Sequence, residues 1–533
     1  MSDTAAAGDD GRQATSAAAA SDEDQRRPER ERKLRQTIAD TPGLVNCITA
    51  FLPLYLLGLL STTAWDPTAP THSHLTIDST NSNERSVWQR VPLALGTQWA
   101  NKLTRLTTIT LRYPVGAALW CIDVFITVIE GHVAGRRAAN MNGGTLRTIT
   151  LEGVRLAERE MSTVGRPQQL PPDQIPPLVP PPSLDALTTI TGLLDDHHDL
   201  ADRGWRMPSL ETVEHHRWGA DKLGRLICSS ESLQLICGDL PAAEEWASVF
   251  ERMPEAAAGQ RGPLAGLRSI GTIDLGFDAD RARAAVDRLQ VALTSRGCRR
   301  SLTQLVVSMS DWIIDSRVLP LLQSLDSLHN TCCRPEAEVA VEYLDAYFFD
   351  LSFFYSDDFP TNPSPLFKTA IQAAARKVDE VRYVISQHDL THPVDSPSQA
   401  AIDLAKTLTF DKVEDVWVND ADGFIPPPNA PSPQPTIITH LQQFPRATCL
   451  EVNSGVGSAA GRLMAEKMPR VVEWLEFNSA VSGEDRRAVL EAVGARREVD
   501  TVEVDECPMV WRPLRLPSSS ATASHQSWVA SEA

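Results

Sequence analysis

Residues 450–461, with the sequence LEVNSGVGSAAG, combine types that can bind a small ligand. A short apolar run that ends at Val452 leads into Gly455 and Gly457, and then into a run of small residues that favours a helix. Glycine has no Cβ, so the backbone N–H groups of such a turn can approach a bound molecule closely. The next apolar run carries an acidic residue, Glu476. A strand, a glycine turn, a helix and a following acid form an arrangement in which a cofactor could bind.

This arrangement resembles the cofactor loop of S-adenosylmethionine-dependent methyltransferases, which would imply a methyl-transfer enzyme. Asn453 stands where that family has its first glycine, and residues 456–533 are too few to complete a doubly wound sheet. In the alternative interpretation, the glycines only turn the chain tightly into the helix of a repeat. We therefore expect no enzyme and no cofactor, and we keep the methyltransferase as the alternative from a different class.

Residues 195–199, Asp-Asp-His-His-Asp, carry side chains that can ligate a metal ion. Consecutive residues cannot all turn toward one ion, and the sequence shows no second cluster to complete a site. We therefore predict no metal site and expect a polar loop or helix end at these positions.

The chain is strongly acidic, with 69 Asp and Glu against 50 Lys and Arg and a net charge of -19. That sign opposes broad binding to nucleic-acid phosphates and suits a protein partner with a basic surface. The nine cysteines contain no C-x-x-C pair, which argues against zinc and indicates a reducing compartment. We expect a cytoplasmic protein, with the nucleus as the alternative because residues 25–35 form a basic run.

Apolar residues recur along the chain as apolar-x-x-apolar-x-apolar, a spacing that predicts short strands with one face toward a core. The last four repeats begin at Val413, Ala447, Val472 and Val499, separated by 34, 25 and 27 residues. Amphipathic helical patterns lie between the strands. Further strands are predicted at 103–111, 146–151, 210–214, 267–275, 302–307, 339–344 and 381–385, and helices at 115–133, 279–293, 311–328, 365–378 and 398–408.

This strand-and-helix repeat resembles the leucine-rich-repeat family, whose period is roughly 20–30 residues. The resemblance covers residues 101–507 and implies an irregular α/β solenoid with parallel strands on its concave face, helices outside, and a role in protein–protein recognition. Pro-rich inserts at 166–182 and 426–435 are expected to be extended surface loops. The family closes each strand with Asn or Cys at a position that only Cys507 fulfils here. We expect Asn453 and Asn478 to close neighbouring turns instead.

Residues 41–65 contain no charged side chain, and three interpretations of them remain open. Six residues resemble the F-box pattern, an apolar helix broken at Leu-Pro and closed by Trp: Leu44, Ile48, Leu52, Pro53, Leu57 and Trp65. The resemblance implies a helical module at 37–100 that binds a Skp-type adaptor, with the chain as substrate receptor of a cullin ubiquitin ligase. The alternatives are a membrane span that tethers the binder and a helical cap on the solenoid. Residues 1–36 and 508–533 are expected to be disordered tails.

Parallel strands in register would stack their outward side chains into columns. One predicted column holds Trp417, Glu451, Glu476 and Glu503, and the next holds Asn419, Asn453, Asn478 and Asp505. With Asp415 and Trp474 they form the predicted partner-binding face. Glutamates in line repel one another at a cost in stability, which a binding surface for a basic partner would explain. The alternative is that Glu and Asn are only the solvated side of the strands.

Overall fold

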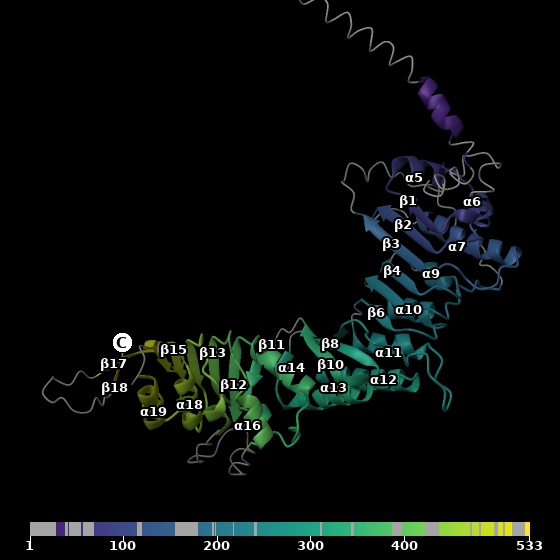
Figure 1. Ribbon diagram of the computed structural model, residues 1–533. Helices are drawn as coiled ribbons and strands as arrows, with labels where there is room; N and C mark the ends of the chain where they lie inside the picture. Colours follow the sequence, from purple (N-terminus) through teal and green to yellow (C-terminus); the bar gives the residue numbers. More distant parts are fainter. Residues whose placement is uncertain are drawn as a thin grey trace, which may run out of the picture. The chain divides into compact units, whose positions relative to one another are not determined.

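The protein is a mixed α/β chain with parallel sheets, seen in a computed structural model (Figure 1). It forms two compact units, one of Met1–Gly192 with Arg203–Pro208 and one of Leu193–Asp202 with Ser209–Ala533. The structure describes residues 28–37, 41, 55–56, 69–114, 120–154, 180–194, 197, 199–216, 218–238, 242–309, 312–342, 346–385, 397–421, 436–468, 472–478, 481–494, 499–504, 507–513 and 528–532.

The first unit contains a run of parallel strands that follow one another in chain order. They are β1 (His74–Asp78), β2 (Thr108–Pro114), β3 (Thr148–Val154) and β4 (Thr189–Leu194). Alternate side chains such as Ile109 and Leu111 are fully buried. The leucines that precede β2, β3 and β4 are buried as well, which explains the wide apolar spacing of the sequence: Leu103, Leu106, Leu146, Leu184 and Leu187. The helices of this unit are α5 (Ser82–Trp88), α6 (Leu93–Ala100) and α7 (Trp120–Ala138).

A buried ion pair holds residues 203–208 onto the first unit. Arg203 donates from Nε and Nη2 to the two carboxylate oxygens of Glu130 on α7, at 2.7 and 2.6 Å. Trp205 donates to the same carboxylate from Nε1 at 3.1 Å. The Arg203 and Glu130 side chains are only 11% and 7% exposed. Both charged side chains are therefore largely removed from water, so breaking their contact is costly.

The second unit repeats the same strand-and-helix alternation. Strand β5 (Thr212–His216) pairs in parallel with β6 (Leu235–Cys237), and β7 (Ile273–Asp274), β8 (Leu302–Ser308) and β10 (Cys333–Glu342) form a three-stranded parallel sheet. A nine-stranded sheet follows, in the order β18-β17-β16-β15-β14-β13-β12-β11-β9. Its strands are β9 (Trp312–Ile314), β11 (Ala346–Asp350), β12 (Glu380–Ile385), β13 (Asp415–Asp420), β14 (Cys449–Val452), β15 (Val472–Phe477), β16 (Val499–Val504), β17 (Cys507–Pro513) and β18 (Trp528–Glu532).

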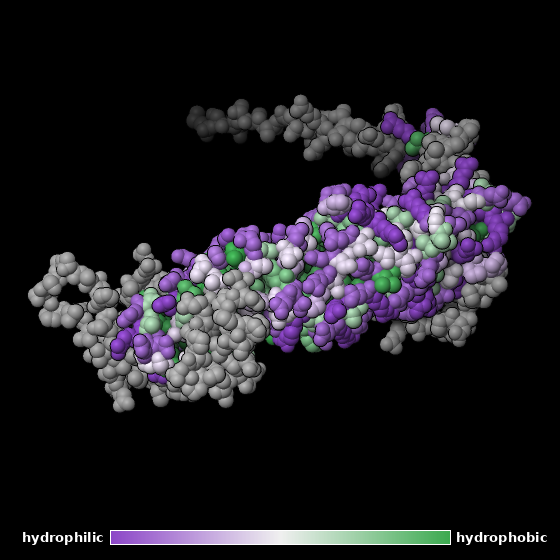
Figure 2. Space-filling model, turned by 90° about the horizontal axis from the view of Figure 1, so that it is seen from below, coloured by the Kyte–Doolittle hydropathy of each residue, from purple (hydrophilic) through white to green (hydrophobic). Residues whose placement is uncertain are grey.

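Helices of the second unit cover one side of these strands. In Figure 1, α16, α18 and α19 lie along one side of β12 to β15. The helices are α9 (Asp199–Asp202), α10 (Ala220–Ile227), α11 (Ala243–Glu251), α12 (Ala279–Ser295), α13 (Leu319–Cys332), α14 (Pro365–Ala375), α16 (Gln399–Ala405), α17 (Thr436–His440), α18 (Ser458–Lys467) and α19 (Gly483–Gly494). The surface seen in Figure 2 is predominantly hydrophilic, as expected for amphipathic helices that bury only their inner face.

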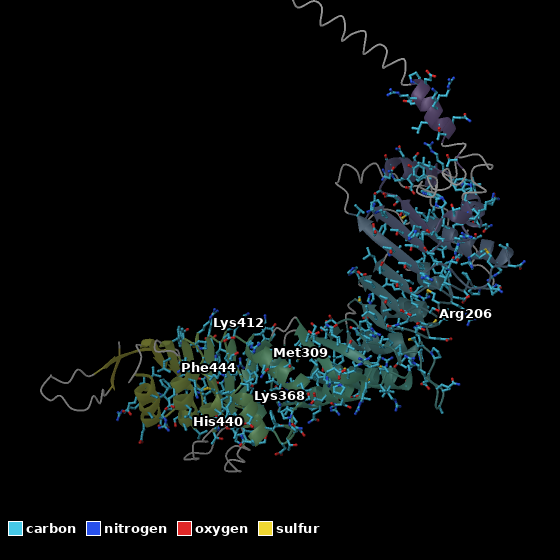
Figure 3. The ribbon with its side chains drawn as sticks, in the orientation of Figure 1. Arg206, Met309, Lys368, Lys412, His440 and Phe444 are labelled. Atoms are coloured by element: carbon cyan, nitrogen blue, oxygen red, sulfur yellow. The ribbon has the colours of Figure 1, made fainter. Side chains whose placement is uncertain are left out.

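An aromatic core supports the middle of the nine-stranded sheet. The rings of Phe349 and Phe410 are 5.5 Å apart, and those of Phe410 and Phe444 are 5.3 Å apart, both edge to face. All three side chains are fully buried, and Figure 3 labels Phe444 among the side chains of this unit. Aromatic packing of this kind fixes the strands that carry the outward residues described below.

The structure differs from the sequence predictions in several places. Strands β1, β4, β6, β9 and β11 were not predicted; β1 lies within 37–100, which we expected to be helical, and β9 lies within the predicted helix 311–328. Strands β17 and β18 lie largely within 508–533, which we expected to be disordered, and they pair antiparallel. A two-residue link joins β16 to β17, which allows only an antiparallel return of the chain.

The three interpretations of residues 41–65 fall mostly on positions that the structure does not describe. Leu44, Ile48, Leu52, Pro53, Leu57 and Trp65 all lie outside the described residues. Within the described ranges, no helix has both the length and the apolar character needed to cross a bilayer.

We predict that Glu130→Ala lowers the free energy of unfolding of the first unit by about 3–5 kcal/mol, because Arg203 and Trp205 would lose the buried carboxylate that accepts their hydrogen bonds. Denaturant unfolding followed by tryptophan fluorescence measures the change. Glu251→Ala is the matched control, since it removes the exposed pair with Arg288, and it should cost less than about 1 kcal/mol. Equal effects of the two substitutions would contradict the assignment of Glu130 to a buried pair.

Candidate functional site

The strands of the second unit align their outward residues in two columns. In the first, Arg382 lies opposite Trp417, Trp417 opposite Glu451, Glu451 opposite Glu476, and Glu476 opposite Glu503. The second contains Phe348, Glu380, Asp415, Cys449, Trp474 and Thr501. Along each of these strands, the residue that separates one column from the other points to the core. Val416, Leu450 and Leu475 occupy this position and are fully buried. We call the outward side chains of β11 to β15 in these two columns the acidic strand face.

Negative charge dominates this face. Glu380, Asp415, Glu451 and Glu476 are carboxylates, whereas Arg382 is the only cation among the described outward residues of β12 to β15. Neighbouring strands lie about 4.8 Å apart, so Glu451 and Glu476 are close enough to repel each other. Burial raises the pKa of Glu451, and the charges of Glu476 and Glu380 raise it further, whereas the Asn453 amide and Arg382 lower it.

The thiol of Cys449 lies within the same face. Burial raises its pKa to about 12, and the nearby carboxylates of Asp415, Glu451 and Glu476 contribute to the increase. A thiol with so high a pKa stays protonated at neutral pH and is a poor nucleophile. Cys449 is therefore a poor candidate for a nucleophile, and the other outward side chains of this face offer charge and aromatic contact.

Aromatic side chains flank the one cation. The guanidinium carbon of Arg382 lies 3.9 Å from the centroid of the Phe348 ring and 5.2 Å from that of Trp417. Arg382 also forms an ion pair with Glu380. Farther along the sheet, Trp474 is 40% exposed, and its Nε1 donates to Glu476 at 3.3 Å. An exposed tryptophan beside carboxylates has the composition of an interaction surface.

The sequence did not reveal Phe348, Glu380 or Arg382 as part of this face. Only the stretch Val381–Ile385 was predicted as a strand there, and its alternation could have placed Arg382 outward. The contact between Arg382 and Trp417 joins residues of different strands, which no local pattern reports. Asp505 lies outside the described residues, and of Glu503 the structure gives only its place in β16.

The column of asparagines lies at the ends of the same strands. The side-chain amide of Asn478 donates to the backbone carbonyl of Asn453 at 2.6 Å, and the backbone N–H of Asn453 donates to the carbonyl of Val418 at 2.8 Å. The side chain of Asn478 thus satisfies a backbone carbonyl at the end of the neighbouring strand. The amide of Asn453 donates to the carboxylate of Glu451 instead, while Asn419 occupies the corresponding position of β13 opposite Val384.

The outward positions of the first unit are chemically different. Thr76, Thr110 and Thr150 lie opposite one another on β1, β2 and β3, and Thr191 of β4 lies opposite Thr150. A second row contains Thr108, Thr148 and Thr189. These hydroxyls carry no charge, and the row beside them has one cation, Arg112, between the carboxylates of Asp78 and Glu152. Negative charge is therefore denser on the strand face of the second unit, where four carboxylates accompany Arg382.

The glycine-rich segment after β14 is used for packing. A Cβ on Gly457 would approach Cγ1 of Val418 to 2.8 Å, and one on Gly461 would approach Cγ2 of Val452 to 2.9 Å. Both glycines therefore allow α18 to lie close to β13 and β14. This arrangement agrees with the repeat interpretation of residues 450–461, in which the glycines bring the chain tightly into the next helix.

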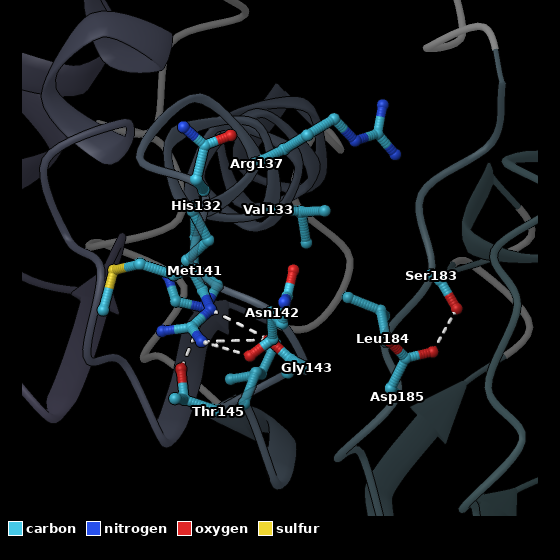
Figure 4. Close-up of a pocket in the computed structure, with 14 residues that line it drawn as sticks. His132, Val133, Arg137, Met141, Asn142, Gly143, Thr145, Ser183, Leu184 and Asp185 are labelled. Carbon is cyan, nitrogen blue, oxygen red and sulfur yellow. Dashed lines mark hydrogen bonds between the residues drawn. The ribbon is translucent and has the colours of Figure 1, made fainter.

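The first unit contains a pocket of about 310 Å³ between the end of α7, residues 140–146 and residues 183–185 (Figure 4). Burial lowers the pKa of His132 to about 4, so its ring is neutral at neutral pH, and the ring contacts the carbonyl of Leu103 and the hydroxyl of Thr145. Arg136 donates to the carbonyls of Thr104 and Gly143. These two side chains stabilise the surrounding loop through its backbone.

The predicted absence of a metal site concerns residues 195–199. Asp195, Asp196 and His198 lie outside the described residues, and Nδ1 of buried His197 accepts the backbone N–H of Leu194 at 2.9 Å. Over the part of the chain that the structure covers, no group of three or more His, Cys, Asp and Glu side chains is placed to hold a metal ion.

Comparison with known proteins identifies no family for this sequence. No protein-family model matches the sequence, and no curated protein matches it significantly. The solved crystal structure of a TLR13–ssRNA13 complex is similar at 10% sequence identity with a TM-score of 0.20, over 76% of this chain and 49% of that one. The chain thus spans about half the length of that structure's chain. A TM-score this low does not establish a shared fold.

We predict that Glu451→Gln raises the free energy of unfolding at neutral pH by about 0.2–1 kcal/mol, because it removes repulsion along the column. The folded-state pKa of Glu451 is raised, so its ionisation destabilises the fold as pH rises through that pKa. The gain from Glu451→Gln should therefore vanish at low pH and shrink in high salt.

Thermal unfolding at several pH values measures this gain. Glu380→Gln is the control, because Glu380 pairs with Arg382 and its removal should not stabilise the protein. A loss of stability in Glu451→Gln at neutral pH would show that the glutamates do not repel one another.

Proposed function

We propose that this chain is a protein-recognition scaffold, built as a leucine-rich-repeat-like solenoid with its strands on the concave side, whose acidic strand face binds a basic surface of a partner protein. The proposal is supported first by the register of β12 to β16, which aligns Trp417, Glu451 and Glu476. A column of like charges costs stability. A binding role would explain why residues that cost stability are kept beside half-buried Trp417 and exposed Trp474.

The electrostatics of the face favour a basic partner over other classes. Complementary charge accelerates encounter and rejects partners of the wrong sign, and this chain has a net charge of -19. Nucleic acid carries the same sign as the face and is disfavoured. The aromatic side chains Trp417 and Trp474 supply contact area of the kind found at the centre of interfaces.

Three more specific functions are not part of the proposal. A substrate receptor of a ubiquitin ligase and a membrane-tethered binder both depend on residues 41–65, and the methyltransferase depends on ligand binding by residues 450–461. No observation on the described residues favours any of the three over a scaffold.

The proposal predicts that Glu451→Lys with Glu476→Lys abolishes capture of the basic partner. The tagged full chain is used for affinity capture from cell extract, and bound proteins are quantified by mass spectrometry in low and high salt. A partner with a basic surface should be enriched by the unchanged chain, lost in the charge-reversed variant, and released by salt.

The control is Thr110→Lys with Thr150→Lys, which adds two positive charges to outward strand positions of the first unit, half of the change in net charge that reversal of Glu451 and Glu476 makes. This control should retain capture, and the circular dichroism of both variants should match that of the unchanged chain. Capture that survives reversal of Glu451 and Glu476 would exclude this face as the binding site.

A further inference from the structure

Phe348, Arg382 and Trp417 form one cluster on three adjacent strands, which we call the cation clamp. Phe348 lies on β11, Arg382 on β12 and Trp417 on β13. The guanidinium lies over both rings, at 3.9 Å from Phe348 and 5.2 Å from Trp417. Distances below about 6 Å are those of favourable cation–π contact. The surrounding carboxylates Glu380 and Glu451 favour any cation held there.

The chain's own arginine demonstrates which group the clamp accepts. A guanidinium is planar and weakly hydrated, so it stacks on aromatic faces better than the compact, strongly hydrated ammonium of lysine. Arg382 is anchored at one end by Glu380, and the two side chains remain 29% and 19% exposed. The clamp is thus open to solvent at its outer side, where a partner would approach.

We propose that the cation clamp is the subsite that receives an arginine side chain of the basic partner, and that Arg382 occupies it in the free protein as a built-in competitor. This inference rests on the proposed function, because it concerns the same acidic strand face. Binding moves the Arg382 guanidinium off the Trp417 ring and places the partner's guanidinium there, between the aromatic rings and the carboxylates of Glu380 and Glu451. Arg382 thereby lowers the affinity of the face for its partner, and only segments that carry an arginine can displace it.

The test measures binding of a fluorescently labelled oligo-arginine peptide to the full chain by anisotropy, with oligo-lysine as the comparison. Arg382→Gln should bind oligo-arginine about threefold or more tightly, because the competitor is gone and the rings are free. Oligo-lysine should gain less. Arg112→Gln is the matched control: it removes the same charge from an outward strand position of the first unit, where Arg112 pairs with Glu152, and should leave binding unchanged.

A second substitution distinguishes the contribution of the aromatic rings to binding from that of charge. In Arg382→Gln with Trp417→Leu, the gain should disappear, because the aromatic face that receives the guanidinium is lost. Phe348→Leu with Arg382→Gln provides an independent variant in case the Trp417 substitution affects folding, which circular dichroism and thermal unfolding monitor.

Three results would overturn the clamp. Arg382→Gln that binds no more tightly, a gain that persists without Trp417 and Phe348, or an equal gain for oligo-lysine would each show that Arg382 contributes charge only. In those cases the proposed function stands as long as Glu451→Lys with Glu476→Lys still abolishes peptide binding. If that charge reversal leaves peptide binding unchanged, the proposed function fails as well.

Discussion

Parallel pairing of strands in register is the constraint on which the rest of this structure depends. Strands β12 to β15 present apolar side chains inward at alternate positions, as with Val416, Leu450 and Leu475, which lie opposite one another and are fully buried. A shift of one residue would bring the outward side chains into the core and expose the apolar ones. Burial of one column therefore fixes the neighbouring outward columns, so the alignment of glutamates on the surface follows from packing beneath it.

This constraint also explains why the charges of the acidic strand face cannot relax. Glu451 and Glu476 are held on rigid neighbouring strands, and the raised pKa of Glu451 reflects both burial and the charge of its neighbours. The guanidinium of Arg382, which contacts the rings of Phe348 and Trp417, relieves part of the repulsion between the carboxylates. The face is thus negative overall, with its one described cation already engaged. That combination is the basis of the proposal that the face binds a basic partner. Cys449 beside these carboxylates remains a protonated thiol at neutral pH.

The sequence predicts the part of the fold that rests on local periodicity. The spacing of Val413, Val416 and Val418 and its counterparts indicated β13 to β16 and their parallel order, and the alternation within them placed Trp417 and Glu451 outward. Strand β4 was missed although Leu184, Leu187 and Ile190 repeat the spacing of Leu103, Leu106 and Ile109. Strand β11 has a run of aromatic residues, Tyr347 to Phe349, in place of the aliphatic pattern, and the Phe348–Arg382–Trp417 contacts join separate strands. Such contacts follow from the three-dimensional register, which no local pattern contains.

The register of β14 and β15 is tested most directly by disulfide cross-linking in a Cys449→Ser background. Opposite residues on neighbouring strands lie about 4.8 Å apart, within the Cα separation of roughly 4.4–6.8 Å that a disulfide spans. Under mild oxidation, Glu451→Cys with Glu476→Cys should cross-link efficiently, as mapped by peptide mass spectrometry, whereas Glu451→Cys with Asn478→Cys, offset by two residues, should not. Efficient cross-linking of the offset pair without that of the opposite pair would contradict the register, and with it the acidic column.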